Sequence, residues 1–160
     1  MSQTETKKRK LKYDPNKCIA CRSCEIACAI GHSDSKDIYL AIKEESVSLP
    51  RVKVFASGER KNFPIACRHC DEPKCIEACI SGALIKNSET GIVEYNKDKC
   101  IGCWMCVMAC PYGAIRPIPK TKKVIRCDLC QDQDSPRCVE ACPVKAIILE
   151  DQMKPQLTER

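Results

Sequence analysis

The sequence CIGCWMCVMAC, residues 100–110, contains four cysteines in one short stretch. Cys100, Cys103 and Cys106 follow one another at equal intervals, and Cys110 comes after a slightly longer step. Structural zinc is usually held by two C-x2-C pairs that lie well apart in the sequence. Three thiols from one tight loop instead predict ligands at the corners of a centre larger than a single ion. This spacing leaves open whether Cys110 serves the same centre.

The other cysteines repeat this arrangement. All 16 cysteines of the 160-residue chain fall into four groups of four, and every group begins C-x2-C and ends C-x3-C. An alanine precedes the last cysteine of each group. In chain order the groups are Cys18, Cys21, Cys24 and Cys28; Cys67, Cys70, Cys75 and Cys79; Cys100, Cys103, Cys106 and Cys110; and Cys127, Cys130, Cys138 and Cys142.

Iron–sulfur clusters explain these cysteines better than zinc does. The pattern C-x2-C-x2-C-x3-C-P binds [4Fe–4S] clusters, and in proteins with two such clusters the fourth cysteine binds the other cluster. Two groups have this spacing, two have a longer middle gap, and no cysteine is left over. We therefore expect four [4Fe–4S] clusters, with all sixteen cysteines as iron ligands. A zinc-stabilised scaffold or nucleic-acid-binding protein is the alternative.

Clusters would also supply stability that the apolar residues cannot. Leu, Ile, Val and Phe make up about a fifth of the chain, near the limit at which chains stay disordered. A bound metal centre contributes its binding free energy to folding. The N-terminal sequence lacks the apolar segment of a signal peptide, and no apolar run approaches the roughly 20 residues of a membrane helix. We expect a soluble, cytoplasmic protein with reduced cysteines and no direct membrane insertion.

The basic residues have two interpretations. The formal net charge is +6, and four clusters, each 2− with its thiolates, would bring it to about −2. The basic excess is then internal compensation for the clusters. The runs KKRKLK at 7–12 and KTKKVIR at 120–126 could instead bind nucleic acid, but aromatic residues for base stacking are scarce around them. We interpret both runs as solvated segments and expect no nucleic-acid partner.

Short strands and turns are expected between the cysteine groups. Residues 83–95, ALIKNSETGIVEY, predict a hairpin that turns at NSETG. Residues 114–127 predict a second hairpin, in which two prolines limit the ladder. Residues 51–56, RVKVFA, alternate as a strand does, and a short helix is expected around Cys106–Ala109. Residues 33–50 are predicted to form a surface insertion that a partner could bind.

The four groups in this order resemble the iron–sulfur subunits of the dimethyl sulfoxide reductase family, and CRHCDEPKC at 67–75 is the most specific motif. The compact length, together with the sequences at 21–37 and 100–115, is similar to the ferredoxin-like subunits of carbon monoxide dehydrogenase, hydrogenase and tungsten aldehyde oxidoreductase complexes. The resemblance covers most of the chain. It implies an α+β fold of two bacterial-ferredoxin-like dicluster units, with short hairpins and short helices around four iron–sulfur clusters.

The resemblance also implies that the groups pair in a nested order. An inner unit spans 64–115, and an outer unit combines 11–32 with 122–150. The insertion then spans 33–63, and the tails are a basic 1–10 and 151–160. The implied ligand sets are Cys67, Cys70 and Cys75 with Cys110; Cys100, Cys103 and Cys106 with Cys79; Cys18, Cys21 and Cys24 with Cys142; and Cys127, Cys130 and Cys138 with Cys28. Proline follows the last cysteine only in the third and fourth groups, a departure that affects the turn and not the ligand count.

Four residues near the predicted ligands could influence the clusters. His69 could be a ligand or a proton-coupled partner, but its group already has four cysteines. We therefore favour a structural donor to nearby backbone or sulfur, of the kind that tunes cluster potentials. His32 is also assigned a structural role. Trp104 and Met105 are expected to shield the third group from water rather than to relay electrons.

Closely spaced clusters suit the transfer of single electrons, and the sequence has no nucleotide-binding or hydrolase motif that we recognise. We expect no catalytic residues and predict a non-catalytic electron-transfer subunit. It would connect a separate catalytic oxidoreductase subunit to another redox carrier or a flavin reductase subunit. The resemblance implies a role in anaerobic metabolism. It also implies that the catalytic partner is a tungsten or molybdenum aldehyde or formate enzyme, carbon monoxide dehydrogenase or hydrogenase. A free polyferredoxin is the alternative.

Overall fold

The computed structural model describes residues 9–56 and 62–150. Within this part of the chain, every strand is three residues long and pairs antiparallel with one other strand. The elements in chain order are β1 (Leu11–Tyr13), α1 (Ser23–Gly31), α2 (Ile38–Ala41), β2 (Lys53–Phe55), β3 (Phe63–Ile65), α3 (Lys74–Glu77), β4 (Leu84–Lys86), β5 (Val93–Tyr95), α4 (Met105–Ala109), β6 (Arg116–Ile118), β7 (Lys123–Ile125), α5 (Arg137–Glu140) and β8 (Ile147–Leu149).

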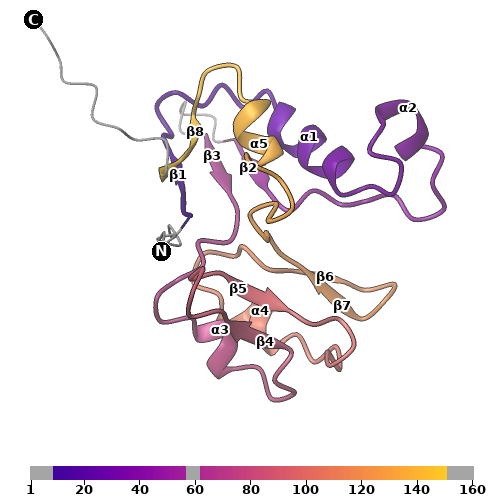
Figure 1. Ribbon diagram of the computed structural model, residues 1–160, viewed down its shortest axis with the longest axis vertical. Coiled ribbons are helices and arrows are strands. Elements are labelled where there is room, and N and C mark those ends of the chain that lie inside the picture. The colour runs from indigo at the N-terminus through magenta and orange to yellow at the C-terminus, as the bar shows by residue number, and fades with distance from the viewer. Residues whose placement is uncertain (1–8, 57–61, 151–160) are drawn as a thin grey trace, which may run out of the picture.

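These elements gather in two halves (Figure 1). The upper half contains β1, α1, β2, β3, α5 and β8, which come from the two ends of the described chain, and α2 projects from its side. The lower half contains α3, β4, β5, α4, β6 and β7 from the middle of the chain. This arrangement of short hairpins and helices is the α+β fold that the sequence predicted. Most of the predicted tails lie outside the described residues.

The first and last strands join the two ends of the described chain. Leu11 pairs with Leu149 in the β1–β8 ladder, and Tyr13 pairs with Ile147. The ladder is extended on both sides, because the Asp14 amide donates to Ala146 and the Glu150 amide donates to Lys10, each over 2.8 Å. Leu149 and Ile147 are buried. No pattern in the sequence predicts this pairing.

Both predicted hairpins between the cysteine groups are confirmed. β4 pairs with β5, and the turn between them is held by Asn87, whose side chain accepts the amides of Glu89 and Thr90. Gly91 closes the turn with a positive φ of 70°, a conformation that favours glycine. In the second hairpin, Pro117 pairs with Val124 in a sheet of only two strands, where a missing amide donor is tolerated.

The predicted strand at 51–56 is also confirmed as β2, which pairs with β3 across Val54 and Pro64. Val52 and Val54 are almost fully buried, because the alternating side chains turn one face toward the core. This part of the predicted insertion is therefore not a surface feature. Residues 33–50 do lie largely on the surface, as predicted, and include the short helix α2.

The hydrophobic core is built partly from the cysteines themselves. One cluster of buried residues includes Leu129, which is fully buried, and combines cysteines from α1 and α5 with Val54 of β2 and the preceding Val52. A second cluster in the other half combines Cys75 and Cys106 with Leu84 and Ile115. Because cysteines fill these positions, anything that binds the thiols acts directly on the core.

Candidate functional site

Four helices determine where the cysteines meet. In α1, Cys24 and Cys28 lie four residues apart and therefore share one face of the helix. The pairs in α3, α4 and α5 have the same spacing, with the second cysteine at or just beyond the end of the helix: Cys75 and Cys79, Cys106 and Cys110, and Cys138 and Cys142. α1 packs on α5, and α3 packs on α4. Each helix thus contributes cysteines to two neighbouring positions.

Three small cavities are each lined by four cysteines, three from one group and one from another. Site A is lined by Cys18, Cys21, Cys24 and Cys142. Site C is lined by Cys67, Cys70, Cys75 and Cys110. Site D is lined by Cys79, Cys100, Cys103 and Cys106. Most of the other lining residues are apolar or proline, for example Val54, Ile115 and Leu84.

The remaining four cysteines, Cys28, Cys127, Cys130 and Cys138, are all buried, and we call their position site B. Burial raises the pKa of the Cys138 thiol, and the neighbouring thiols of Cys127, Cys28 and Cys130 raise it further. The His32 ring lies 3.7 Å from the Cys28 sulfur and 4.0 Å from that of Cys130. The structure therefore brings together all sixteen predicted site residues in the four sets that the resemblance implied. Their role as ligands stays a prediction.

Some of the buried thiols in these sites resist ionisation. Burial and neighbouring cysteines raise the pKa of Cys24 to about 12 and that of Cys75 to about 11. The thiolate is the form that binds metal, so ionisation of such groups depends on a compensating charge. Backbone amides already point at some sulfurs: the Arg51 amide lies 3.2 Å from the Cys28 sulfur, and the Ala146 amide lies 3.2 Å from that of Cys142. These donors favour sulfur in its ionised form.

Each cysteine loop contains residues with a left-handed backbone. Arg22 and Trp104 precede α1 and α4 with φ of 61° and 58°, and His69 and Leu129 adopt φ of 47° and 61°. Such residues cost free energy outside glycine and persist where the surroundings enforce them. Loops that alternate left- and right-handed residues form concavities of amide groups that bind anions. A [4Fe–4S] cluster with four thiolates is such an anion.

Four buried side-chain polar atoms of the described residues have no hydrogen-bond partner, namely Tyr13 Oη, His69 Nε2, Trp104 Nε1 and Arg126 Nε. All four can donate, since the other ring nitrogen of His69 accepts the Val93 amide. Buried donors without acceptors are costly and rare. His69 and Trp104 belong to the loops of sites C and D, and the Cys127 thiol adds to burial in raising the pKa of Tyr13. Cluster sulfur atoms would accept from such donors, so these residues fit iron–sulfur clusters.

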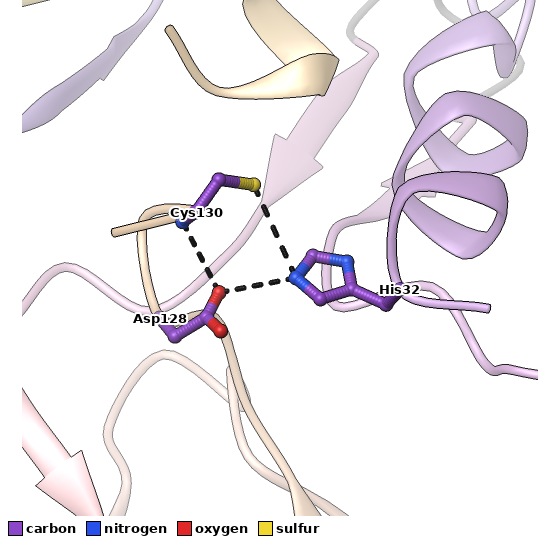
Figure 2. A group of neighbouring side chains, drawn as sticks. All are labelled: His32, Asp128 and Cys130. Atoms are coloured by element: carbon purple, nitrogen blue, oxygen red, sulfur yellow. Dashed lines mark hydrogen bonds and ion pairs between the residues drawn. The ribbon is translucent and has the colours of Figure 1, made fainter. Parts of the chain in front are cut away.

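A charged network covers site B (Figure 2). Figure 2 shows the His32 ring, at the end of α1, pointing toward Asp128 and Cys130. Its Nε2 lies 3.2 Å from Asp128 Oδ1, its Nδ1 lies 2.7 Å from the carbonyl oxygen of Cys28, and Arg51 pairs with the other oxygen of Asp128. Burial opposes the charge on His32, yet these partners and the nearby thiols raise its pKa to about 12. His32, Asp128 and Cys130 carry donor atoms that suit a metal ion, but Cys130 belongs to site B.

His69 Nδ1 is an acceptor, so the predicted donor role would fall to Nε2 and stays a prediction. Nδ1 accepts the Val93 amide over 3.0 Å. Burial and the nearby Arg126 lower the pKa of His69 to about 3, so the ring is neutral and its proton lies on Nε2. Trp104 lines site D as expected. Met105 does not line it, and its side chain is half exposed.

The interpretation of the basic run at 120–126 as solvated needs a correction. Lys120 and Lys122 are exposed, in agreement with that interpretation. Arg126 is buried, with an exposed fraction of 5%. The reason is the period of β7 and its extension, because Val124 and Arg126 turn to the interior on the same side of the chain. In the other basic run, Arg9 donates to the carbonyl of Gln133, and residues 7 and 8 lie outside the described part.

Sites A and D are the two sites with an exposed cysteine. Cys21 in site A and Cys103 in site D are exposed, whereas the cysteines of sites B and C are buried or half-buried. Ile19 beside site A and Ile101 beside site D are also strongly exposed, and both line their cavities. The exposed sites thus carry apolar surface.

Comparison with known proteins identifies the chemistry of these sites. Residues 59–152 match the family described as 4Fe-4S dicluster domain, and residues 15–31 match a 4Fe-4S binding domain. The electron transport protein HydN of Escherichia coli strain K12 is 35% identical over 157 residues, which cover 88% of this chain and 87% of HydN. An iron-sulfur protein of Rhodospirillum rubrum is 37% identical over 156 residues, covering 86% of this chain and 80% of that protein.

Two further matches come from oxidoreductases. One polypeptide of the anaerobic dimethyl sulfoxide reductase of E. coli strain K12 is 35% identical over 151 residues, which cover 84% of this chain and 69% of the reductase polypeptide. Among solved structures, a chain of the active-site complex BamBC of benzoyl coenzyme A reductase with benzoyl-CoA has a TM-score of 0.50. It is 22% identical, and the match covers 88% of this chain and 78% of that chain. That likeness shows a shared fold.

Together these findings establish the cofactor and the class of protein. The matching domains and the 16 cysteines fit four [4Fe–4S] clusters. The relatives are electron transport proteins and one polypeptide of an oxidoreductase, so the protein is an iron–sulfur electron carrier and not a catalytic subunit. Among the described helices, none combines the length and apolar character that crossing a bilayer requires.

Proposed function

Because the protein belongs to the 4Fe-4S dicluster family of iron–sulfur proteins, we propose that it relays single electrons through its four sites in the order A, B, C, D. The two ends of this relay would serve a separate catalytic oxidoreductase subunit and another redox carrier. The exposed cysteines at sites A and D, with two enclosed sites between them, are the observation that carries the proposal.

The order follows from which cysteines are neighbours. Sites A and B share helices α1 and α5, and sites C and D share α3 and α4. Sites B and C come together at Cys127 and Cys67, whose thiols are close enough for one to raise the pKa of the other. Both side chains belong to the same buried cluster. Every step of the proposed relay therefore joins sites that share a helix or a core contact.

The ligand roles are part of the proposal. In each site, three cysteines of one group and the last cysteine of another would bind the four irons of one cluster. Each bound cluster supplies the ability to gain and lose one electron. The chain contributes the thiolates, the amide donors, and the apolar side chains that exclude water, such as Ile115 at site C and Leu84 at site D.

Protein partners would cover the exposed ends. Ile101, which lines site D, and Ile19, which lines site A, are strongly exposed. Met105 and Met108 on α4 and Ile26 on α1 are exposed on helices that carry cysteines of these sites. Exposed apolar residues that gather beside a site favour protein contact. Two relatives or structural neighbours come from oxidoreductases, dimethyl sulfoxide reductase and benzoyl-CoA reductase. They support a catalytic partner in general.

On the resemblance set out above, we further propose that the catalytic partner is a tungsten or molybdenum aldehyde or formate enzyme, carbon monoxide dehydrogenase or hydrogenase. A redox carrier or flavin reductase subunit would bind at the other end of the relay. The cytoplasm is the proposed location, because sixteen cysteines that are to bind clusters must stay reduced, as they do in a reducing compartment. No nucleic-acid partner is proposed, because Arg126 in the second basic run faces the interior. A free polyferredoxin remains the second candidate, since both ends have access to solvent.

Counting electrons tests the relay. The protein is purified anaerobically, oxidised and titrated with dithionite while its visible absorption and its electron paramagnetic resonance signal are followed. We expect one electron for each site, which gives about four for each chain. A colourless, zinc-loaded protein, or one that takes up no electrons, would overturn the proposal.

Purification from the native host separates the two candidates. A tagged chain isolated anaerobically should carry a second subunit at fixed stoichiometry, and tungsten, molybdenum or nickel analysis of that complex identifies the class of its catalytic centre. A chain that elutes alone, yet still accepts about four electrons, favours the free polyferredoxin.

A further inference from the structure

Arg126 is a buried cation beside site C. Its exposed fraction is 5%, and its guanidinium group stays charged at any physiological pH. It follows β7 directly and precedes Cys127 of site B, yet one of its Nη atoms lies 3.0 Å from the sulfur of Cys67 in site C. The side chain therefore bridges from the loop of one enclosed site to a sulfur of the next.

The described part of the chain offers Arg126 no carboxylate partner. Its other Nη atom donates to the carbonyl of Val93, and no ion pair joins it to an acidic residue of that part. Asp128 is the nearest acidic residue in sequence, but it pairs with Arg51 and His32. A buried charge without a counter-charge is strongly destabilising. The sulfur atoms of site C are thus the anions left to balance Arg126.

Val93 and His69 fix the position of the guanidinium group. Val93 accepts from Arg126 through its carbonyl and donates its amide to His69 Nδ1 over 3.0 Å. The same His69 nitrogen lies 3.4 Å from Arg126, and since arginine can only donate, this nitrogen is the acceptor of both. The group is therefore held against Cys67 by a strand and a neutral ring, and it has little freedom to turn toward solvent.

We propose that Arg126 is the buried counter-charge of site C and makes its cluster the most easily reduced of the four, because Asp128 offsets the charge of His32 beside site B, whereas no carboxylate of the described residues pairs with Arg126. This inference rests on the proposed function. A cluster gains one negative charge on reduction, so a fixed cation beside it stabilises the reduced state more than the oxidised state. The hydrogen bond to the Cys67 sulfur acts in the same direction. The relay would then have an enclosed electron store at site C, next to site D.

The test is a redox titration of the anaerobically purified holo-protein, followed by electron paramagnetic resonance. Arg126→Gln removes the charge and keeps a polar, though shorter, side chain. We expect the equilibrium constant for reduction of one of the four clusters to fall at least tenfold. This corresponds to a fall of about 59 mV in the midpoint potential of that cluster. Arg126→Lys keeps the charge and should retain most of the potential.

Arg116→Gln is the matched control. Arg116 is the partly buried arginine at the start of β6 in the same hairpin, and it donates to the carbonyl of Pro50 instead of to a cysteine. We expect its four midpoint potentials to equal those of the unchanged protein. Equal potentials in Arg126→Gln, at full iron content, would overturn the inference while leaving the relay intact. An unchanged protein without four titrating clusters would overturn the relay itself.

A second measurement decides the matter if Arg126→Gln loses iron. In the otherwise unchanged protein, Cys70→Ser alters the signal of the cluster at site C without touching Arg126. The altered signal should be the one that appears first as the potential is lowered. If a signal that Cys70→Ser leaves unaltered appears first, site C does not hold the most easily reduced cluster and the inference is wrong.

Discussion

Cys110 lines the same cavity as Cys67, whereas Cys106, one helical turn earlier in α4, lines a different one. The helix therefore divides the closely spaced group at 100–110 between sites C and D. The same division occurs in α1, where Cys24 lines site A and Cys28 lies in site B. Three residues separate the last two cysteines of each group, and this spacing explains the division. Residues four positions apart share a helix face but lie about one full turn apart along the helix, so they reach neighbouring sites.

Substituting Cys110 should damage site C first. Cys110→Ala removes a proposed ligand of the cluster at Cys67, Cys70 and Cys75, so we expect that cluster to lose iron or convert to a three-iron form, which electron paramagnetic resonance detects. Cys106→Ala is the matched control from the same helix and should damage site D instead. Identical spectra from the two variants would contradict the division of the group.

Iron analysis should give about sixteen iron and sixteen sulfide ions for each chain, because four complete ligand sets hold four irons each. The measurement requires anaerobic purification and elemental analysis that includes zinc. A well-loaded sample with about eight irons and two zinc ions would contradict the four clusters.

Gly102 should tolerate a side chain less well than Gly82. Both glycines have a positive φ, of +74° and +62°, so alanine is strained at either position. A methyl group at Gly102 would also collide with the carbonyl oxygen of Lys122, whereas Gly82 has open space within 4 Å. We expect Gly102→Ala to lower the free energy of unfolding by about 1–3 kcal/mol more than Gly82→Ala.

Thermal bleaching of the visible absorption measures this difference. Gly102 lies between Cys100 and Cys103, so its variant should bleach at a lower temperature than the Gly82 variant. Equal midpoints for the two would mean that Lys122 moves aside without cost.

Removing the iron should unfold most of the chain. The buried clusters of side chains contain cysteines from both halves, including Cys138 and Cys106, and without metal the remaining apolar residues form a thin core. Circular dichroism after chelation and reduction should show loss of helix and no cooperative thermal transition. A native-like cooperative transition in the iron-free protein would contradict this account of stability.

A charge at the exposed end of site D should block the partner and spare the clusters. Ile101→Glu changes an exposed side chain that lines site D, so we expect normal iron content but slower electron exchange with the partner subunit. Ile85→Glu alters a similarly exposed isoleucine on β4 that lines none of the cysteine cavities of the described chain and serves as control. Equal rates in the two variants would remove site D from the partner interface.

Local features of the fold could be predicted from the sequence. The hairpin at 83–95 has its turn residues between two apolar segments, and the short helix expected around Cys106–Ala109 is α4. The pairing of Leu11 with Leu149 could not be predicted in this way. Its strands have three residues each and are separated by most of the chain, so no turn joins them and no long pattern identifies them as partners.

The chemistry of the site could be predicted where it depends on residues that are close in sequence, but not where it depends on distant contacts. Sixteen cysteines in repeating groups indicate clusters without any structure. Arg126 looked like one more lysine or arginine of an exposed run, because its burial depends on Val93 and Cys67, which lie far from it in sequence. His69 was placed beside the cysteines correctly, but the direction of its hydrogen bond depends on the amide of Val93. The period-two alternation that places Val124 and Arg126 on one side was the signal available.

A crystal structure of the anaerobically purified protein, with anomalous data at the iron edge, tests the central claim most directly. We predict four [4Fe–4S] clusters, with Cys110 bound to the cluster of Cys67, Cys70 and Cys75, and with Cys142 bound to that of Cys18, Cys21 and Cys24. A map in which Cys110 binds the same cluster as Cys100, Cys103 and Cys106 would contradict the exchange of ligands on which the relay is built.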